Sequence, residues 1–355
     1  MSTEAQIVVL PAGGTTLEIQ TVQIPDPGPF EVLVRQRATG VCHSQLGHIA
    51  AADPAQPLVL GHESYGTVVA VGDQVTHVVP GQDVFITWIS RNAARKPNGV
   101  TIPFPDGSAA TTRNVFTWGT YALADEQYVV AAPSDLPPDV ASIIGCAVMT
   151  GAGAVLNSSP VAQGDTVAVW GVGGVGLVSV AAAKISGASR IVAVDIDERK
   201  LDFSRHFGAD DVVNALTADA VSEIRRLAPR TDGVEGVDHS YDCTGRADNL
   251  AKSLAVVRPG VPGRNQGGSL VLVSVIRGSL EIPGMEMLNG QKHITGCLGG
   301  SGVPERDFPV YVDWYRSGRL DLDALVTNRY TLEQVNDAVA DLRGGKILGR
   351  AVIEF

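Results

Sequence analysis

The sequence predicts an α/β protein in which a doubly wound parallel sheet is inserted into a mostly β domain. Two patterns carry this prediction. Short segments that alternate apolar and polar residues fill the first 150 residues, and strand-like and helical segments alternate regularly after about residue 139. The length of 355 residues also suits two domains, since about 150 residues per domain is a reasonable prior. We expect 1–150 and 298–355 to form the mostly β domain, and 151–297 to form the inserted one.

Alternation with a period of two identifies strands in the first part, at 31–41, 67–71 and 84–88. A helical stretch opens at Pro138-Asp139, and Asp139 is the expected N-cap residue. The segment 91–114 is rich in Arg, Asn, Gly and Thr, so we expect a long loop there.

The inserted part begins with a buried strand at 166–170 and a helix at 174–186, followed by a strand at 190–194 and a helix at 197–207. Further strands are expected at 211–213, 238–242 and 269–273, with helices at 218–227 and 249–257. Two helical patterns, 307–317 and 332–342, precede a closing strand at 350–355. Such alternation is typical of a doubly wound parallel sheet.

Composition excludes several classes of protein. The 27 Lys and Arg against 38 Asp and Glu give a net charge of −11, with no basic stripe, so we expect no nucleic-acid partner. Four cysteines far apart do not make a disulfide framework, which favours a reduced, cytoplasmic setting. The first residues lack a signal-peptide pattern, and glycines break the uncharged stretch 166–183, so we expect no membrane partner.

A glycine motif, Gly171-Val172-Gly173-Gly174-Val175-Gly176, directly follows the strand at 166–170 and opens a helix. In such a motif Gly171 permits the tight turn, Gly173 lets the backbone approach a pyrophosphate, and Gly176 permits close packing of helix and strand. The N-terminus of the helix then carries the phosphate charge. The glycine pattern alone is weak, because an ordinary strand-to-helix turn can show it.

Asp195 strengthens that interpretation. It lies 19 residues after Gly176, at the end of the next strand. A carboxylate there accepts hydrogen bonds from the adenosine ribose and repels a 2′-phosphate, which favours NAD over NADP. The alternative is that Asp195 only caps the helix that follows. With the motif and Asp195 together, the sequence predicts a Rossmann domain that binds NAD.

A second set of residues has the chemistry of a zinc site: Cys42, His62, Glu63 and Cys146. Catalytic zinc takes three protein ligands, for which two cysteines and a histidine are one known combination, and keeps a fourth position open for water or substrate. Taken one at a time, each residue has a plainer explanation, since a lone cysteine is usually a small buried hydrophobe.

At these residues the sequence resembles the medium-chain zinc-dependent alcohol dehydrogenases, and the resemblance spans almost the whole chain. Gly61-His62-Glu63-Ser64-Tyr65-Gly66, with Gly72 after it, resembles the zinc signature of that family. The other matching motifs stand in the same order, namely Cys42-His43-Ser44, Gly145-Cys146 with Thr150-Gly151, the glycine motif, Asp195 and the segment 350–355. The resemblance implies a GroES-like catalytic domain around the Rossmann domain.

The resemblance also implies a role for each matching residue. Cys42, His62 and Cys146 match the ligands of one catalytic zinc, and Glu63 matches an adjacent carboxylate that is sometimes a transient fourth ligand. Ser44 matches the hydroxyl that takes the proton of the substrate alcohol. The expected cofactor contacts are His43 and Arg350 to the pyrophosphate, Thr150 to the nicotinamide and Lys200 to the adenosine ribose. Trp88 matches a residue that lines the substrate pocket, although a core aromatic on a strand is as good an explanation.

Three departures from the family pattern matter. Where many members hold a structural zinc with four cysteines, this chain has Asn92, Arg95, Asn98 and Asp106, so we expect no structural zinc and a lobe held by ordinary packing. Gln45 stands where the family usually has an aspartate that supports the zinc-bound histidine. Gly47 replaces the histidine that passes the proton to solvent in some members, which leaves His48 or water for that step.

The predicted function is therefore the interconversion of an alcohol and its aldehyde or ketone by hydride transfer with NAD(H). Trp88 suggests a hydrophobic or aromatic small-molecule alcohol. Two alternatives stay open: a metal-free enone or quinone reductase on the same scaffold, and a catalytically silent NAD(H)-binding protein. Relatives are dimers or tetramers, and we expect a homodimer. Cys243 and Cys297 are expected to be small core residues.

Overall fold

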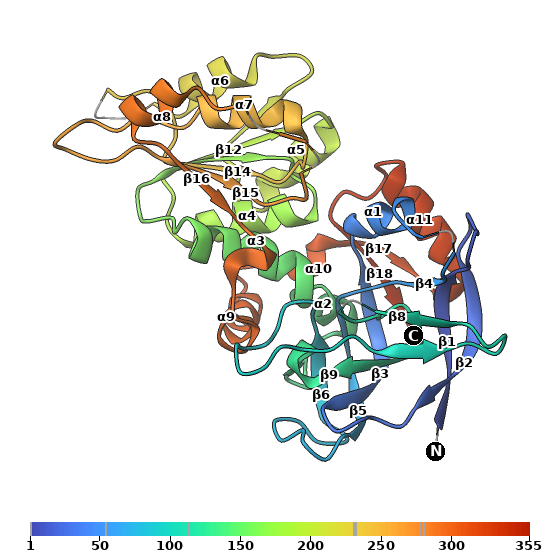
Figure 1. Ribbon diagram of the computed structural model, residues 1–355. Helices are drawn as coiled ribbons and strands as arrows, with labels where there is room; N and C mark the ends of the chain where they lie inside the picture. Colours follow the sequence, from blue (N-terminus) through green and yellow to red (C-terminus); the bar gives the residue numbers. More distant parts are fainter. Residues whose placement is uncertain (1, 54, 113, 230–232, 277, 280) are drawn as a thin grey trace. The chain divides into compact units, whose positions relative to one another are not determined.

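The computed structural model describes residues 2–53, 55–112, 114–229, 233–276, 278–279 and 281–355. The chain divides into two compact units (Figure 1). Unit 1 comprises Met1–Cys146, Val303–Val310 and Leu322–Phe355, and unit 2 comprises Ala147–Gly302 and Tyr311–Asp321. The boundaries expected from the sequence, after residues 150 and 297, stay a prediction.

Unit 1 is built around a seven-stranded sheet with the strand order β10-β6-β5-β3-β18-β17, and β9 also pairs with β3. Its long central strand β3 (Glu31–Val41) runs antiparallel to β5 (Ser64–Val71), β9 (Tyr121–Asp125) and β18 (Arg350–Glu354). The alternating segment 31–41 is therefore confirmed as a strand. Because β18 pairs with the end of β3, the last residues of the chain lie beside residues 38–41.

The other strands of this sheet are β6 (Asp83–Ile86), β10 (Val129–Ala131) and β17 (Val326–Tyr330). A separate three-stranded sheet joins β1 (Ser2–Leu10), β2 (Glu18–Pro25) and β4 (Leu58–Val59). The helices that lie wholly in unit 1 are α1 (Ser44–Ala50), α2 (Pro138–Ser142), α10 (Leu322–Leu325) and α11 (Val335–Arg343). Helix α9 (Pro304–Arg316) belongs to unit 1 up to Val310 and to unit 2 from Tyr311.

Two sequence expectations for unit 1 were wrong in detail. The segment 91–114 is not only a loop, because β7 (Thr101–Pro103) and β8 (Ala109–Thr111) form an antiparallel hairpin within it. The N-cap of α2 is Pro137, and Asp139 lies in the first turn instead. Pro138 suits the first helical position because the backbone N–H that it lacks has no partner there.

Unit 2 contains a parallel sheet with the strand order β13-β12-β11-β14-β15-β16. Its strands are β11 (Thr166–Trp170), β12 (Arg190–Asp195), β13 (Asp211–Asn214), β14 (His239–Asp242), β15 (Ser269–Leu272) and β16 (His293–Gly296). The order reverses between β11 and β14, which is the doubly wound arrangement of a Rossmann domain. Every residue of β11 is buried, as expected for a strand covered on both faces.

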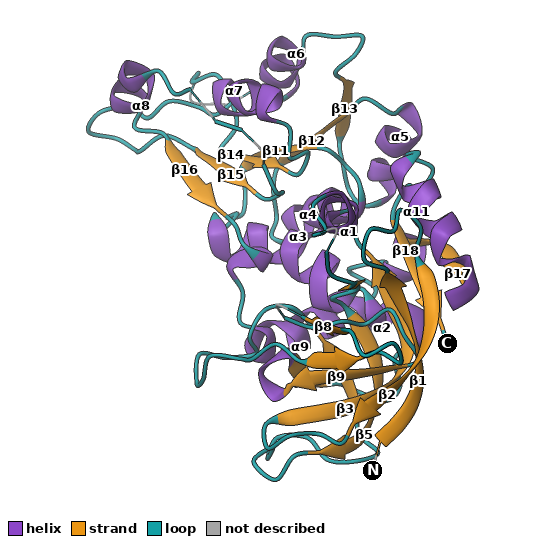
Figure 2. Cartoon of the chain, turned by 45° about the vertical axis from the view of Figure 1, so that its right-hand side comes forward, coloured by secondary structure: helices purple, strands orange, loops and turns teal. Residues whose placement is uncertain are grey.

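Helices cover both faces of this sheet (Figure 2). Helices α3 (Met149–Gly153) and α4 (Gly174–Ile185) lie on one face, whereas α6 (Ala220–Leu227) and α7 (Ala247–Ala255) lie on the other. The remaining helices are α5 (Glu198–His206) and α8 (Gly284–Gly290). The predicted fold class, a doubly wound domain inserted in a mostly β domain, is confirmed.

One helical stretch of the described residues, Pro138–Ser158, is long and apolar enough to cross a membrane. Of its most apolar window, 89% is buried inside the protein. Core helices of proteins that never enter a membrane pass the same test, so this stretch is weak evidence for a span.

Candidate active site

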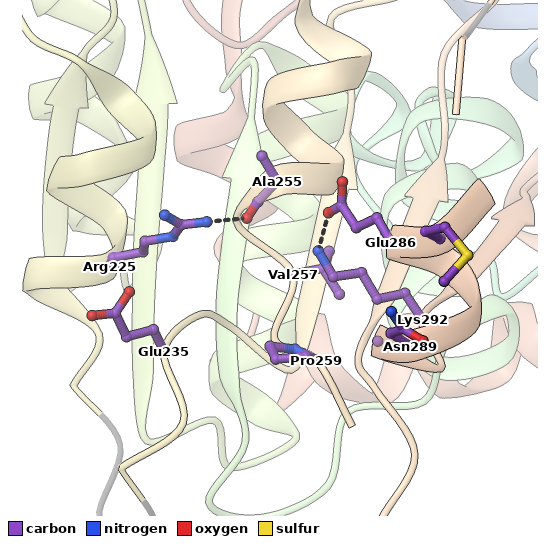
Figure 3. A pocket seen from close by; sticks show the side chains of 10 residues that line it. Arg225, Glu235, Ala255, Val257, Pro259, Glu286, Asn289 and Lys292 are labelled. Carbon is purple, nitrogen blue, oxygen red and sulfur yellow. Dashed lines mark hydrogen bonds and ion pairs between the residues drawn. The ribbon is translucent and has the colours of Figure 1, made fainter. Parts of the chain in front are cut away.

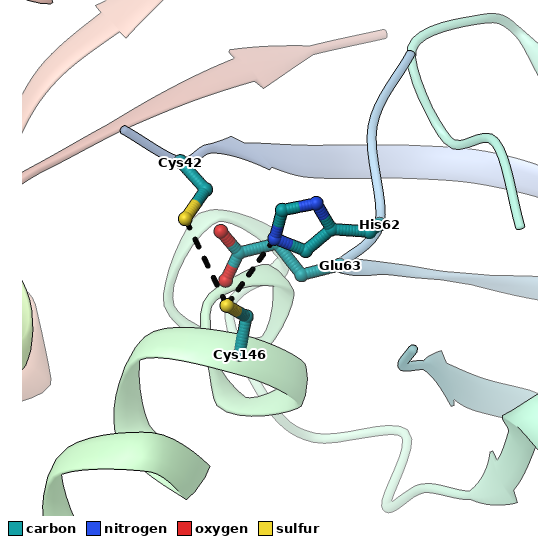
Figure 4. A group of neighbouring side chains, drawn as sticks. All are labelled: Cys42, His62, Glu63 and Cys146. Atoms are coloured by element: carbon teal, nitrogen blue, oxygen red, sulfur yellow. Dashed lines mark hydrogen bonds between the residues drawn. The ribbon is translucent and has the colours of Figure 1, made fainter. Parts of the chain in front are cut away.

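The four predicted metal-ligating residues come together within unit 1. Cys42 follows directly after β3, His62 and Glu63 lie just before β5, and Cys146 lies in the helical segment Ile144–Val148 (Figure 4). One ligand atom from each residue can be chosen so that all lie within 4.8 Å of one another. Cys146 and Cys42 are 104 residues apart in sequence, so the fold, not a local loop, assembles this set.

The spacing of the donor atoms fits a tetrahedral zinc ion. The Cys42 and Cys146 Sγ atoms are 3.9 Å apart, and His62 Nε2 lies 3.3 Å from Cys146 Sγ. Zinc bonds of about 2.3 Å to sulfur and about 2.0 Å to nitrogen place two tetrahedral sulfur ligands about 3.8 Å apart, and a sulfur and a nitrogen about 3.5 Å apart. Two thiolates and an imidazole are also the donor types that zinc prefers.

The surroundings of the two thiols favour the thiolate form, which binds metal, at Cys42 but not at Cys146. A hydrogen bond from Cys146, together with the nearby His62 and Arg350, holds the pKa of Cys42 well below its usual value despite burial. The same hydrogen bond and burial raise the pKa of Cys146. Burial lowers the pKa of His62 and is the largest single effect, but the charge of Cys42, its hydrogen bond and the charge of Glu63 together outweigh it, so the pKa of His62 is raised. Cys42 is therefore the first of these thiols to become a thiolate.

Glu63 and Arg350 form a buried ion pair beside this set. Glu63 is 0% and Arg350 5% exposed, and a guanidinium nitrogen of Arg350 contacts Glu63 Oε1. Burial lowers the pKa of Arg350, but Glu63 and the two cysteines more than offset this, so the pKa is raised. Gly40 makes room for the pair, because a Cβ atom there would lie 2.5 Å from the Glu63 carboxyl carbon. Arg350, expected to contact the cofactor, is thus paired with Glu63 in this structure.

Gln45 supports His62 from the other side. Its Oε1 accepts a hydrogen bond of 3.0 Å from the backbone N–H of Gly61, and its Nε2 lies 2.5 Å from His62 Nδ1. Gly61 has φ +91°, and a Cβ atom there would overlap the backbone of Trp118. The turn before His62 therefore requires glycine at this position.

Three further candidates lie at helix α1: Ser44 and His48, expected on the path of the substrate proton, and His43, expected to contact the cofactor pyrophosphate. The Ser44 hydroxyl donates to Cys42 Sγ at 3.3 Å. His48 lies one helical turn after Ser44 and is exposed, so both residues share a face of α1. His43, at the N-cap of α1, is also exposed.

Trp88 lies next to the metal-ligating set. Its ring centroid is 6.2 Å from that of His62, in an edge-to-face arrangement. The indole is half-buried, and its Nε1 has no hydrogen-bond partner in the described part of the chain. The structure thus places Trp88 beside a predicted zinc ligand, as expected for a residue that lines the substrate pocket.

The glycine motif of unit 2 has the geometry of a phosphate-binding turn. Gly171 has φ +81°, and a Cβ atom at Gly176 would lie 2.0 Å from the Gly171 carbonyl oxygen, so both positions require glycine. Apart from Gly173 and its neighbours in sequence, no atom of the described chain lies within 4 Å of a Cβ atom built at this position. Packing within the protein therefore does not require glycine at position 173. The open space beside this backbone is where a pyrophosphate would approach. Gly174 and Val175 form the first turn of α4.

Asp195 connects the end of β12 to this turn. Its carboxylate accepts hydrogen bonds from the N–H groups of Val172 at 2.9 Å, Ile196 at 2.7 Å and Asp197 at 3.1 Å. The N-cap residue of α5 is Asp197, whose side chain accepts from the N–H of Arg199. Asp195 is therefore not the helix cap that the alternative explanation required.

The two remaining cofactor candidates also lie in unit 2. Lys200 is in the first turn of α5 and is half-buried. Thr150 is a buried residue of α3.

Apolar packing holds part of the lobe after Trp88, as expected, because Val100, Ile102 and Ala110 lie in the buried core of unit 1. Its first residues, 91–98, are held in addition by charged and polar contacts. Arg95 Nη2 lies 2.6 Å from Asp125 Oδ1, and its guanidinium lies 4.4 Å from the ring centroid of Phe30. The N–H of Asn98 donates to Asp125 at 2.9 Å, and the Asn92 amide donates to Glu305 at 2.8 Å. Asp106 lies apart from these contacts and accepts from Ser108. The adjacent acidic residues Asp125 and Glu126 are the feature of the sequence that could have predicted these ion pairs.

Two hollows lie away from these residues. One, of about 520 Å³, lies in unit 2 between α6, α7 and α8 (Figure 3). There Arg225 donates to the carbonyl of Ala255 at 2.8 Å, and Lys292 pairs with Glu286 at 2.6 Å. Because these cations are already paired, we assign the hollow no ligand. The other, of about 610 Å³, lies on unit 1 at residues 35–37.

Comparison with known proteins agrees with the fold and with the resemblance found in the sequence. The family models for the alcohol dehydrogenase GroES-like domain and the zinc-binding dehydrogenase match residues 28–134 and 174–317. A putative alcohol dehydrogenase D of Mycobacterium tuberculosis is 32% identical, with 97% of this chain and 98% of that protein covered.

Two crystal structures are similar over nearly the whole chain. One is an alcohol dehydrogenase zinc-binding domain protein from Burkholderia ambifaria, with a TM-score of 0.88, 30% identity and 100% of both chains covered. The other is benzyl alcohol dehydrogenase from Acinetobacter calcoaceticus, with a TM-score of 0.86, 30% identity and 99% of both chains covered. With such similarity over its full length, the chain belongs to the medium-chain zinc-dependent alcohol dehydrogenases and is an oxidoreductase that interconverts alcohols with aldehydes or ketones.

Proposed function

We propose that this chain holds one zinc ion with Cys42, His62 and Cys146, and that it oxidises a hydrophobic or aromatic alcohol with NAD. The observation that carries the proposal is the spacing of the three donor atoms, which fits tetrahedral zinc. The adjacent Trp88 and the similarity to a benzyl alcohol dehydrogenase make benzyl alcohol the first substrate to test.

Different residues around the metal-ligating set are proposed to carry different parts of the reaction. Zinc, when bound, supplies a Lewis acid that polarises the substrate oxygen and lowers the pKa of the alcohol. The Ser44 hydroxyl takes the alcohol proton and passes it along the face of α1 to His48, which is exposed to solvent. Water is the alternative to His48 for this last transfer. Glu63 pairs with Arg350 through Oε1, and one of its carboxylate oxygens lies within 4.8 Å of the three proposed zinc ligands, so it is the candidate for a transient fourth ligand.

The NAD site is proposed in unit 2, at the glycine motif and Asp195. The N–H groups at the start of α4 bind the pyrophosphate, and Asp195 and Lys200 bind the adenosine ribose. Thr150, also in unit 2, is a further proposed contact, whereas the contacts of His43 and Arg350, which belong to unit 1, stay predictions from the sequence. NAD supplies the hydride acceptor, and the substrate carbon that loses the hydride becomes a carbonyl carbon.

Replacing Ser44 with alanine tests the proton path. We expect kcat for benzyl alcohol oxidation to fall by about 10²- to 10⁴-fold, because a positioned proton acceptor contributes that much. The zinc content should stay unchanged, and Ser44→Thr, which keeps a hydroxyl, should retain most of the activity. Full activity in Ser44→Ala would exclude this residue from the proton path.

Replacing Asp195 with alanine tests the cofactor preference. We expect the ratio of kcat/KM for NAD over NADP to fall by about 10- to 100-fold, because hydrogen bonds to a charged group contribute about 1.5–3 kcal/mol. Asp202→Ala, which removes an exposed carboxylate from α5, is the matched control and should leave the ratio unchanged. An unchanged ratio in Asp195→Ala would contradict the proposed role.

We also propose that the zinc is catalytic only and that no structural zinc binds. The lobe where many relatives carry four cysteines is held by the ion pair of Arg95 with Asp125 and by the contacts of Asn92 and Asn98. A reduced cytoplasmic location is proposed with this, since Cys42 and Cys146 must stay unoxidised to bind metal.

A homodimer formed through unit 2 is proposed as the assembly. Strand β16 lies at the edge of the parallel sheet. The neighbouring segment exposes large apolar side chains, with Met285 64% and Leu288 69% exposed. Apolar side chains that lie together on a surface often mark a protein interface, and a second copy of the chain would cover this one.

Sedimentation of the double variant Met285→Glu/Leu288→Glu tests this assembly. We expect the wild type to sediment at twice the chain mass and the double variant to be monomeric. Leu216→Glu places the same charge at a residue that is 73% exposed elsewhere and should remain dimeric. A dimeric double variant would place the interface elsewhere, and a tetrameric wild type would require a second one.

A further inference from the structure

The two groups that face the Gln45 side-chain amide determine which of its atoms accepts a hydrogen bond and which donates one. Its amide is buried and lies between the backbone N–H of Gly61 and the His62 ring. A backbone N–H is always a donor, so the amide atom that faces Gly61 at 3.0 Å must be the oxygen. The atom that faces His62 is therefore the NH₂ group, which can only donate.

This orientation determines which nitrogen of His62 can accept. In the neutral ring, Nδ1, which lies 2.5 Å from the Gln45 NH₂ group, must be the acceptor. The hydrogen of the neutral ring then lies on Nε2, which faces Cys146 Sγ at 3.3 Å. A histidine that binds metal through Nε2 instead carries its hydrogen on Nδ1. In that state the Nδ1–H and the amide NH₂ are two donors facing each other.

The site thus presents two donors, Gly61 N–H and His62 Nδ1–H, to an amide that has one accepting atom. A carboxylate at position 45 would accept from both. We propose that Gln45 is a positioning residue that holds the metal-free His62 in the tautomer unable to bind zinc, so that zinc uptake requires the amide to turn and to give up its bond from Gly61. This inference rests on the proposed zinc centre. It means that the chain binds zinc more weakly than it would with a carboxylate at this position.

Zinc affinity of Gln45→Glu tests the inference. Competition with a chromophoric chelator should show a zinc dissociation constant about 10- to 100-fold lower than that of the wild type, the usual size of effects from partners of a ligating histidine. Ala50→Glu is the matched control, because it adds the same charge at the exposed end of α1. Unchanged affinity in Gln45→Glu, or equal tightening in Ala50→Glu, would overturn the inference.

A second measurement uses the wild-type chain and does not depend on the folding of a variant. In ¹⁵N spectra of the zinc-free protein, at a pH where His62 is neutral, the ring hydrogen should be on Nε2 in the wild type and on Nδ1 in Gln45→Glu. A merely structural role for Gln45 would not move this signal, and a wild-type hydrogen on Nδ1 would overturn the inference.

Cys42→Ala separates failure of this inference from failure of the zinc centre. If Cys42→Ala binds zinc as tightly as the wild type, the proposed metal centre itself is wrong. If zinc binding depends on Cys42 but does not respond to Gln45→Glu, only the role of Gln45 is wrong.

Discussion

Cys42→Ala should remove both the zinc and the activity of this protein. We expect about one zinc per chain in the wild type and less than about 0.1 in the variant. Catalytic zinc needs three protein ligands, and only His62 and Cys146 would remain. The activity should fall by about 10³-fold or more, since the metal stabilises transition-state charge by several kcal/mol and each 1.36 kcal/mol is tenfold in rate. Elemental analysis and NAD-linked benzyl alcohol oxidation on the same preparations measure both effects.

Cys297→Ala is the matched control for this variant. Cys297 is a buried cysteine of unit 2 outside the metal-ligating set, so its loss should leave zinc content and activity near those of the wild type. Zinc retained by Cys42→Ala would contradict the proposed ligand set. About two zinc ions in the wild type would mean that the lobe at 91–114 also binds metal, and none would favour the metal-free reductase.

Local sequence signatures identified the candidate residues of the cofactor site. The glycine motif could be recognised because its residues are consecutive and follow a buried strand, and Asp195 could be recognised by its position at the end of the next strand. The structure adds that Asp195 accepts a hydrogen bond from Val172 within the motif. Cys42, His62 and Cys146 come from three separate segments, so the family resemblance, not local spacing, predicted that they meet.

Contacts between distant segments could not be predicted in this way. Glu63 and Arg350 were both candidates, but 287 residues separate them and no local pattern indicates that they pair. Their contact depends on the pairing of β18 with β3. The segment 91–98 shows the same limit, because the buried partner of Arg95 is Asp125, which lies 30 residues later at the end of β9. In each case the sequence indicated candidate residues, but only the tertiary structure shows which of them form a pair.

Arg350→Met should destabilise the protein severely. The substitution leaves the Glu63 carboxylate fully buried without its guanidinium partner. Removing one member of a buried ion pair typically costs about 3–5 kcal/mol, because the remaining charge is no longer compensated. We expect the midpoint of thermal unfolding, measured by calorimetry, to fall by several degrees or more.

Two further variants show whether this loss comes from the unpaired charge. In the double variant Glu63→Gln/Arg350→Met no charge is left behind, so it should be more stable than Arg350→Met alone. Arg329→Met makes the same substitution at an ion pair with Asp139, where the Arg329 side chain is 45% exposed, and should cost less than about 1 kcal/mol. If Arg350→Met costs no more than Arg329→Met, the Glu63 carboxylate has another means of compensation, and the ion pair is not what stabilises this part of unit 1.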